Sequence, residues 1–268
     1  MSKTQKRKIL YGRTLRELQK QIKFQEQAAY VPISTVKFYE GEKYPYQILV
    51  EKKWLDRGVK MNLTKLFETQ ATLDEHIMQE HPELRGQNNL DWKLLALQVE
   101  LGECANEWRG FKKWSKDQEP RVYVPNPEDL CEECNGEGYF DKHKELKDWI
   151  FCKNCDGCGC HFYNPLLEEY VDCLHFILSI GVEKGYTGVH INLGTIQRMN
   201  MGKDPLKDFG TVFGFIHNFK ENPKHHWYDS VFEGFINLGI ALGFAWNEVE
   251  EAYYAKNRVN HERQNAGY

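Results

Sequence analysis

The sequence predicts a mainly α-helical protein with a small N-terminal α/β appendage and a metal-binding insert. Three observations lead to this prediction. Apolar residues recur at helical spacing through most of the chain after residue 59. Before that point, Val31–Tyr39 and Tyr46–Lys52 are typical of two strands joined by a turn-rich segment. Between the helical segments, two CxxC units follow one another closely, which is typical of a metal site.

Length and composition bound the classes of function. The chain has 268 residues, of which 41% are hydrophobic and 28% charged, so we expect one large globular domain with appendages. The net charge of −4 gives no general basis for binding nucleic acid. No segment approaches an apolar membrane span, and the basic N-terminus lacks the apolar core of a signal peptide. We therefore expect a cytoplasmic protein with neither a membrane nor a nucleic acid as partner.

Residues 1–58 form the predicted N-terminal module. Four apolar residues recur at helical spacing, so a helix is expected from residue 1 to about residue 30: Leu10, Leu15, Leu18 and Ile22. The two strands follow, and Asp56–Gly58 separates the module from the rest of the chain. The module shows no catalytic pattern, so support, dimer contact or partner docking is its expected role.

Residues 59–268 form the predicted main domain. A helix is expected over Leu63–Glu80, with Asn62 or Thr64 as its N-terminal cap. Further helices are expected over about 89–108, 166–184, 205–219 and 227–265. The last of these is long and apolar on more than one side, so we expect it to be buried or to lie in a subunit interface.

Two of the predicted helices carry acidic residues within apolar stripes. Glu100, Glu103 and Glu107 share one helix face, and Glu169 and Asp172 are one turn apart on the second helix. A buried carboxylate is unfavourable unless a cation or a hydrogen-bonding partner compensates for its desolvation. Two such pairs suggest a cage of oxygen ligands for Mg²⁺. The alternative is two ordinary amphipathic helices with acids at the edge of the stripe.

The cysteine-rich insert is predicted over residues 128–162. Cys131 and Cys134 begin one CxxCxGxG motif, and Cys152 and Cys155 begin a second. Four thiolates close a tetrahedral Zn²⁺ site, which is structural because no open position remains. Over these thirty residues or so the insert resembles the cysteine-rich repeats of DnaJ-type chaperones, which implies the zinc site and no activity. Three more potential ligands either stay free or exchange into the site: Cys158, Cys160 and His161.

The end of the last predicted helix carries a polar stripe. Lys256, Asn260 and Arg263 lie on one face, and Asn257 and Gln264 lie on the neighbouring face. One interpretation is a solvated helix end whose cations complement the helix dipole. Beside a carboxylate cage, the same side chains would instead bind phosphate oxygens.

Together these patterns resemble one family. The two acidic pairs are similar to the ExxE…ExxD signature of all-α nucleoside triphosphate pyrophosphatases. Within that group, the chain resembles the dimeric dUTPases, especially those of phages that infect Gram-positive bacteria, over roughly residues 60–115 and 165–268. The closer resemblance rests on four stretches: Leu66–Ile77, Asn106–Ser115, Asp172–Phe176 and Tyr254–Tyr268.

The resemblance implies an all-α pyrophosphatase bundle that forms a homodimer, located in the host cytoplasm if a phage encodes it. It implies Mg²⁺-dependent hydrolysis of dUTP to dUMP and pyrophosphate by activated water. The Mg²⁺ ligands would be four carboxylates: Glu100, Glu103, Glu169 and Asp172. Glu103 would take the proton of the attacking water, with Glu100 beside it.

The resemblance also implies roles for residues outside the acidic pairs. Gln70 would read the uracil edge, and Trp114 would lie along the base or position Lys112. His175 and Phe176 would pack on the deoxyribose and disfavour a 2′-hydroxyl. The phosphates would be bound by the C-terminal stripe, namely Lys256, Asn257, Asn260 and Arg263. The chain departs from the family at Leu73, where an amide often stands, and this departure bears on the uracil assignment.

Two alternatives stay open. A pyrophosphatase of the same fold could act on another nucleotide, such as dCTP or a modified pyrimidine, or act broadly as MazG-like enzymes do. The Tyr254–Tyr268 tail favours the dUTPase branch. The second alternative is a zinc-bearing binding protein whose active site has lapsed, and the intact set of four carboxylates argues against it. Whether dUDP is also cleaved, and whether a regulatory partner binds the added modules, stays open.

Overall fold

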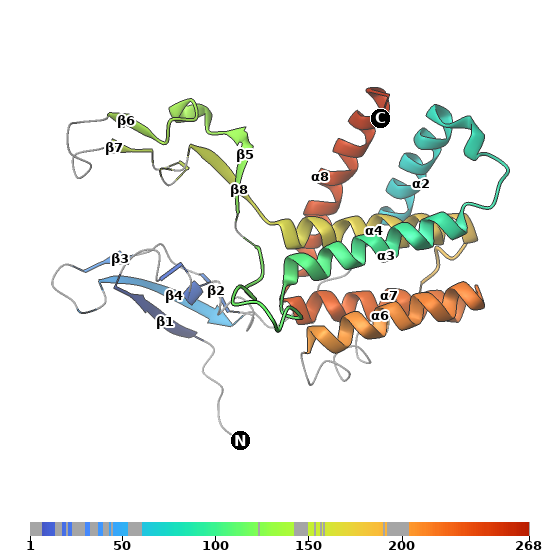
Figure 1. The fold of residues 1–268 in the computed structure, drawn as a ribbon, viewed down its shortest axis with the longest axis horizontal. Helices are drawn as coiled ribbons and strands as arrows, with labels where there is room; N and C mark the ends of the chain where they lie inside the picture. Colours follow the sequence, from blue (N-terminus) through green and yellow to red (C-terminus); the bar gives the residue numbers. More distant parts are fainter. Residues whose placement is uncertain are drawn as a thin grey trace, which may run out of the picture.

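The computed structural model describes residues 61–122, 124–141, 159–189 and 204–267 continuously, together with residue 191 and parts of 7–52 and 150–157. Its described part is mainly helical (Figure 1). The long helices are α2 Leu63–Glu80, α3 Leu90–Trp108, α4 Pro165–Lys184, α6 Pro205–Glu221, α7 His225–Leu242 and α8 Trp246–Asn265. A short 3₁₀ helix, Pro82–Leu84, lies between α2 and α3. In this described part, no helix has the length and apolar character needed to cross a bilayer.

Helix α4 lies at the centre of the bundle. It contacts α2, α3, α7 and α8, while α6 packs against α7 and α3. Helices α2 and α8 also contact each other, and both project from the same side of the bundle (Figure 1). The face of α4 between α2, α3 and α8 is therefore where side chains from four helices can meet.

The starts and ends of α2 and α4 follow signals in the sequence. The Asn62 side chain accepts a hydrogen bond from the Lys65 backbone N–H at 3.2 Å, and that of Asn164 accepts one from Leu167 at 3.0 Å. Helix α4 ends at Gly185, which adopts a left-handed φ of 69°. The predicted helices over 63–80, 89–108 and 166–184 are confirmed.

The prediction of one helix over residues 227–265 is wrong, because the chain breaks there into α7 and α8. Gly243 adopts a φ of 95°, and the backbone N–H of Phe244 turns back to the carbonyl of Gly239 at 2.9 Å. Helix α8 then begins with the Glu248 carboxylate accepting the Ala245 backbone N–H at 3.1 Å. The apolar pattern continues across the break and conceals it.

The apolar character of α7 is explained by the core of this same chain. Phe232, Phe235 and Leu238 are fully buried in a cluster to which all six long helices contribute. Helix α7 therefore packs mainly inside its own chain, as the predicted burial requires.

Two buried tyrosines join helices at points where the partner helix has a glycine. The Tyr170 hydroxyl donates to the Phe235 carbonyl at 2.9 Å, and an added Cβ at Gly239 would overlap that hydroxyl. The Tyr228 hydroxyl donates to the Ile177 carbonyl at 2.8 Å beside Gly181 in the same way. These close approaches fix how α4 packs against α7.

The N-terminal module contains a small antiparallel sheet. Its strands are β1 Arg7–Gly12, β2 Tyr30–Pro32, β3 Lys37–Phe38 and β4 Tyr46–Lys52, and β4 pairs with the other three. The predicted strand over Tyr46–Lys52 is confirmed as β4, whereas the structure describes two short strands, β2 and β3, where one strand was predicted over Val31–Tyr39. The predicted helix over residues 1–30 is wrong at β1, where Leu10 is buried while Ile9 and Tyr11 are exposed, the alternation of a strand. Leu18 lies in a helical stretch and packs against Leu10.

The insert leaves the bundle between the end of α3 and the start of α4 (Figure 1). Strand β5, Val124–Leu130, pairs antiparallel with β8, Cys160–Tyr163. Strand β6, Tyr139–Asp141, pairs with β7, Ile150–Phe151. A short 3₁₀ helix covers Glu132–Cys134.

Candidate active site and cysteine cluster

The packing of α3 against α4 brings the two acidic pairs together. Carboxylate oxygens of Glu100, Glu169 and Asp172 all lie within 4.8 Å of one another. The fourth predicted ligand, Glu103, lies one turn from Glu100 and is exposed, outside this group of three. We call these four residues the acidic cluster. Three of its carboxylates converge and the fourth lies at the rim.

The acidic cluster is electrostatically unfavourable by itself. Burial, followed by repulsion from Asp172 and Glu103, raises the pKa of Glu100 to about 7. Burial and the neighbouring acids likewise raise the pKa of Glu169 to about 7. Burial also raises the pKa of Asp172, although a hydrogen bond from Lys256 opposes the shift. Half-buried carboxylates that repel one another fit a divalent cation bound between them.

Helix α8 brings cations to the acidic cluster. The Lys256 ammonium donates to Asp172 Oδ2 at 2.7 Å and to Glu168 Oε1 at 3.0 Å. Burial alone would lower the pKa of Lys256, but these two carboxylates raise it. Arg263 is exposed, and its charge lowers the pKa of Asp172, so it lies on the same side of the site. Lys256 therefore contacts the acids directly, and the charge of Arg263 acts on Asp172.

The two amides of the predicted stripe differ in their surroundings. Asn257 is buried, and its Nδ2 has no hydrogen-bond partner among the described residues. Asn260 is half-buried further along α8. A buried donor without a partner is costly in a folded protein, so Asn257 is suited to bind a ligand oxygen.

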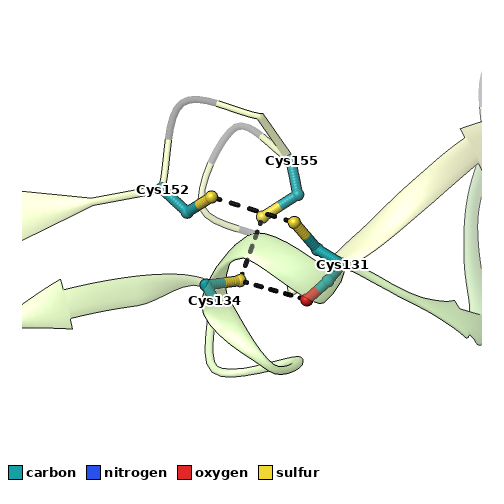
Figure 2. A group of neighbouring side chains, drawn as sticks. All are labelled: Cys131, Cys134, Cys152 and Cys155. Atoms are coloured by element: carbon teal, nitrogen blue, oxygen red, sulfur yellow. Dashed lines mark hydrogen bonds between the residues drawn. The ribbon is translucent and has the colours of Figure 1, made fainter.

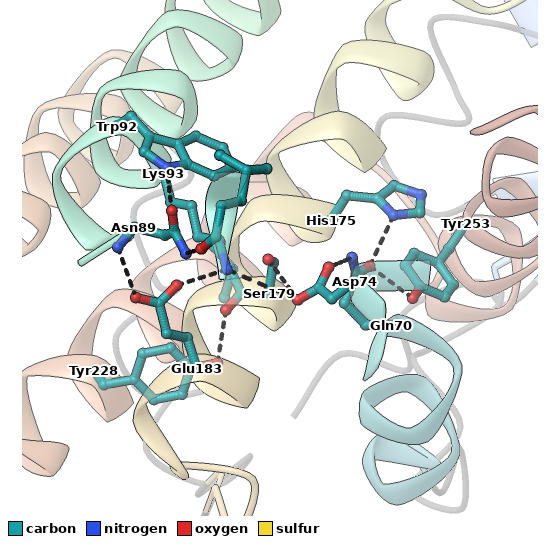
Figure 3. Close-up of polar contacts among 12 residues, drawn as sticks. Gln70, Asp74, Asn89, Trp92, Lys93, His175, Ser179, Glu183, Tyr228 and Tyr253 are labelled. Atoms are coloured by element: carbon teal, nitrogen blue, oxygen red, sulfur yellow. Dashed lines mark hydrogen bonds and ion pairs between the residues drawn. The ribbon is translucent and has the colours of Figure 1, made fainter. Parts of the chain in front are cut away.

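Gln70 lies inside the protein beside His175 (Figure 3). Its Oε1 accepts hydrogen bonds from the Tyr253 hydroxyl at 3.0 Å and from His175 Nδ1 at 2.9 Å. Its Nε2 donates to Asp74 Oδ1 at 2.7 Å. The His175 ring stacks on Tyr253 with centroids 4.3 Å apart. The predicted pair of Gln70 and His175 is thus brought together, although the role of Gln70 at the uracil edge stays a prediction.

The remaining predicted nucleoside contacts are Phe176, Trp114 and Lys112. Phe176 is half-buried against the main core. Trp114 is 79% exposed, and its ring meets Phe111 edge-on with centroids 5.8 Å apart. The Lys112 ammonium also lies over Phe111, 5.6 Å from the ring centroid. The contacts of Lys112 and Trp114 are thus within their own loop, and their roles at the base stay predictions.

Sequence reasoning missed several polar residues around the site. Asp74 lies one turn after Gln70, a spacing visible in the sequence that identifies it as a partner of the amide. Glu168, which binds Lys256, is adjacent to a predicted ligand and could have been found in the same way. Lys93 gave no signal, because its partners lie on other helices.

The four predicted zinc ligands converge in the insert (Figure 2). The sulfur atoms of Cys131 and Cys152 are 3.8 Å apart, and those of Cys134 and Cys155 are 3.7 Å apart. Tetrahedral Zn–S bonds of about 2.3 Å separate two sulfurs by about 3.8 Å, so the spacing fits zinc. Among the residues described, Cys160 is outside this group of four. Cys158 lies outside the described residues.

Backbone groups support the sulfurs symmetrically. Gly138 donates its N–H to Cys134 Sγ and Gly159 donates to Cys155 Sγ, both at 3.2 Å. Both glycines have a positive φ, 79° and 82°, and a Cβ at either one would overlap a carbonyl of the other motif. The glycines of CxxCxGxG are therefore needed by the shape of the site.

Comparison with known proteins adds one finding. A protein-family model described as dUTPase matches residues 62–127 and 160–268. These segments contain all six long helices and the acidic cluster, and residues 128–159 between them contain the four cysteines. Comparisons with curated proteins and with solved structures found no match.

Proposed function

Since the chain belongs to the dUTPase family and hydrolyses dUTP to dUMP and pyrophosphate, we propose that the reaction depends on Mg²⁺ and takes place at the acidic cluster. The observation that carries this proposal is the convergence of Glu100, Glu169 and Asp172 within 4.8 Å. Members of the family generally use a divalent metal ion. The all-oxygen donor set favours Mg²⁺ over softer metals.

The acidic residues have two proposed roles, metal binding and proton transfer. Glu100, Glu169 and Asp172 would hold the metal, with Glu103 beside them. When bound, Mg²⁺ would supply positive charge that stabilises the departing pyrophosphate. Glu103 lies at the exposed rim, where its carboxylate can take the proton of the water that attacks the α-phosphorus. The α–β phosphate bond breaks, and the oxygen of that water stays on dUMP.

Helix α8 would bind the triphosphate. The Lys256 ammonium donates to Asp172 and Glu168 and can turn to a phosphate oxygen when the metal neutralises Asp172. Arg263 lies on the same side of the cluster, and Asn257 offers an unpartnered amide N–H. Asn260 lies between them on α8. These positions support the predicted phosphate contacts.

We also propose that the four-cysteine site holds a structural Zn²⁺. The sulfur spacing and the burial of all four cysteines support it. With four thiolates bound, no position stays open for substrate. The chain then divides into an N-terminal module, 1–58, and a catalytic domain, 59–268, interrupted by the zinc insert, 128–162.

We propose that the enzyme is a homodimer that uses an apolar stripe on α3. Trp92, Leu95 and Val99 lie on one face of the helix and are 41%, 61% and 49% exposed. A second copy of the chain would cover this stripe, as the dimeric character of the family supports. Light scattering of Leu95→Glu should show monomers, whereas Leu206→Glu, at an equally apolar exposed site on α6, should stay dimeric. A dimeric Leu95→Glu variant would exclude this interface.

The central proposal is tested by release of pyrophosphate from a panel of dNTPs. Purified protein freed of metal should be inactive, added Mg²⁺ should restore activity with dUTP, and Glu100→Gln should remain inactive across the titration. Preferred turnover of dCTP or a modified pyrimidine would overturn the uracil assignment. Full activity of Glu100→Gln would place the metal elsewhere.

A further inference from the structure

A chain of buried polar contacts extends from α3 through α4 to α2 (Figure 3). The Lys93 ammonium, on a side chain only 4% exposed, lies 2.7 Å from Glu183 Oε2 and 3.9 Å from Asp74 Oδ2. Asp74 accepts hydrogen bonds from the Ser179 hydroxyl and from Gln70 Nε2, both at 2.7 Å. The reaction described above uses neither Asp74 nor Lys93.

Asp74 sets the donor and acceptor direction along this series of polar contacts. Burial raises the pKa of Asp74, while Lys93 and the hydrogen bonds from Gln70 and Ser179 favour its charged form. A carboxylate only accepts hydrogen bonds, so the Gln70 amide must turn its nitrogen toward Asp74. Its oxygen then faces the other way, where it meets the Tyr253 hydroxyl and His175 Nδ1.

The orientation of Gln70 determines which nitrogen of His175 carries the proton. Because Gln70 Oε1 can only accept, Nδ1 must be the protonated nitrogen, and Nε2 keeps its lone pair. Burial, reinforced by the nearby Lys256 charge, lowers the pKa of His175 to about 3 against an opposing hydrogen bond with the Tyr253 backbone, so the ring is neutral. Nε2 is buried and has no hydrogen-bond partner among the described residues. The protein therefore holds an unused acceptor at this point.

This acceptor lies beyond the acidic cluster along the two helices that build the phosphate end of the site. His175 is one turn after Asp172 on α4, about 4.5 Å along the helix axis. It stacks on Tyr253, which is one turn before Lys256 on α8. On both helices, His175 and Tyr253 therefore lie one turn from the residues proposed to bind the phosphates, which is within the length of a nucleotide.

We propose that Asp74 is a positioning residue for substrate selection: it orients the Gln70 amide, which fixes the tautomer of His175 so that Nε2 accepts a hydrogen bond from the nucleoside. The inference rests on the proposed function, because it places the phosphates at the acidic cluster. The donor is either the uracil N3–H or the deoxyribose 3′-hydroxyl. Cytosine has a lone pair at N3, so an acceptor that meets N3 discriminates against dCTP.

The direct test is Asp74→Asn. The oxygen of the introduced amide should turn to Lys93 and Ser179, so that its nitrogen faces Gln70 and reverses it. Tyr253 can then donate to the Leu66 carbonyl, already 3.4 Å away, and Lys93 keeps Glu183. The variant should therefore fold. Asp74→Leu, which only removes the acceptor, should leave both tautomers populated.

The readouts are ¹⁵N NMR of His175 and the kinetics with dUTP and dCTP. Asp74→Asn should move the proton from Nδ1 to Nε2, raise KM for dUTP by about 10- to 100-fold, and change kcat less. If N3–H is the donor, the preference for dUTP over dCTP falls by a similar factor. If the 3′-hydroxyl is the donor, 2′,3′-dideoxyuridine triphosphate should bind the parent enzyme more weakly than dUTP does. In Asp74→Asn the two nucleotides should bind about equally.

The matched control is Ser179→Ala, which removes the other hydrogen bond to Asp74 without changing the group that faces Gln70. It should keep the Nδ1–H tautomer and the substrate preference. The proposal is overturned if Asp74→Asn keeps the parental tautomer, or if Ser179→Ala alters the substrate preference equally. The NMR measurement needs neither metal nor substrate, so a failure of the Mg²⁺ assignment would be seen separately as activity of Glu100→Gln.

Discussion

The acidic cluster and the cysteine cluster each contain four residues predicted to bind a metal, but they are built in opposite ways. The cysteines are buried, and backbone N–H groups of Gly138 and Gly159 point at their sulfurs. The acids stand on α3 and α4, where backbone N–H groups are used within the helices, and the ammonium of Lys256 bonds directly to Asp172. The cysteine site is buried and its sulfurs accept hydrogen bonds, whereas the acidic site is open and its carboxylates repel one another.

This difference is the basis for proposing a structural centre at the cysteines and a reactive one at the acids. A closed four-sulfur site contributes its binding energy to folding and has no position for a substrate. Like-charged carboxylates at an open rim destabilise the metal-free chain and are relieved by metal and substrate together. The effect of a substitution in one cluster can therefore be compared with that of a substitution in the other cluster or at a neighbouring residue.

The largest effect is expected at the rim of the acidic cluster. Glu103→Gln removes the proposed proton acceptor, so kcat for dUTP should fall by about 10²- to 10⁴-fold. Glu107→Gln is the matched control, because Glu107 lies one turn further along α3 and pairs with Arg121 at 3.2 Å. Pyrophosphate release measures both. Equal losses in the two variants would contradict the role of Glu103.

Loss of a zinc ligand should affect folding more than chemistry. Cys152→Ser should release the zinc and unfold the insert, because several kcal/mol of metal-binding energy is also folding energy. Turnover of dUTP should stay within the same order of magnitude, since the acidic cluster lies on α3 and α4. Metal analysis, circular dichroism and turnover test this separation. Loss of turnover with an intact bundle would show that the insert takes part in catalysis.

Glycine replacements should distinguish the two clusters by their demands on the backbone. Gly138→Ala meets a positive φ of 79° and a carbonyl oxygen of the second motif, so it should cost about 1–3 kcal/mol and weaken zinc binding. Gly102→Ala, on α3 beside the acids, meets nothing within 4 Å and should stabilise α3 by up to about 1 kcal/mol. Thermal melting measures both. Equal destabilisation by Gly138→Ala and Gly102→Ala would contradict the different backbone requirements of the two clusters.

The smallest effect is the pH dependence of the metal-free chain. Glu100 has a pKa of about 7 in the folded state and an ordinary pKa of 4.5, so the folded chain holds more protons between these values. Stability should therefore fall as pH rises through this window. Glu100→Gln should reduce that slope, to which Glu169 also contributes with its pKa of about 7, and should stabilise the metal-free chain above pH 7 by about 1 kcal/mol, allowing for solvent screening. Chemical denaturation across pH measures the difference, and a parallel slope in both proteins would contradict it.

The sequence predicted the local features well and the long-range ones poorly. Asn62, one of the two predicted caps, begins α2, and the spacing of the acids indicated which face of each helix carries the cluster. The break at Gly243 was missed because the apolar period continues through it. Strand β1 was missed because Leu10 fits both a helical stripe and a strand.

The polar network around Gln70 shows why part of the site was beyond sequence reasoning. Gln70 bonds to His175, which is 105 positions away in the sequence, and to Tyr253, which is 183 positions away. No pattern within one helix reports such a pairing, because it depends on how α2, α4 and α8 pack. Asp74 is the exception, since its position one turn after Gln70 is visible in the sequence.

The division between a structural and a reactive metal centre is tested most directly by measuring metal content and activity on the same samples, for the parent enzyme, Cys131→Ser and Glu100→Gln. After dialysis against a mild chelator, the parent and Glu100→Gln should each keep one zinc ion per chain, and Cys131→Ser should keep none. Mg²⁺ alone should then restore dUTP hydrolysis to the parent and not to Glu100→Gln. Zinc retained by Cys131→Ser but lost from Glu100→Gln would contradict the assignment of the two centres.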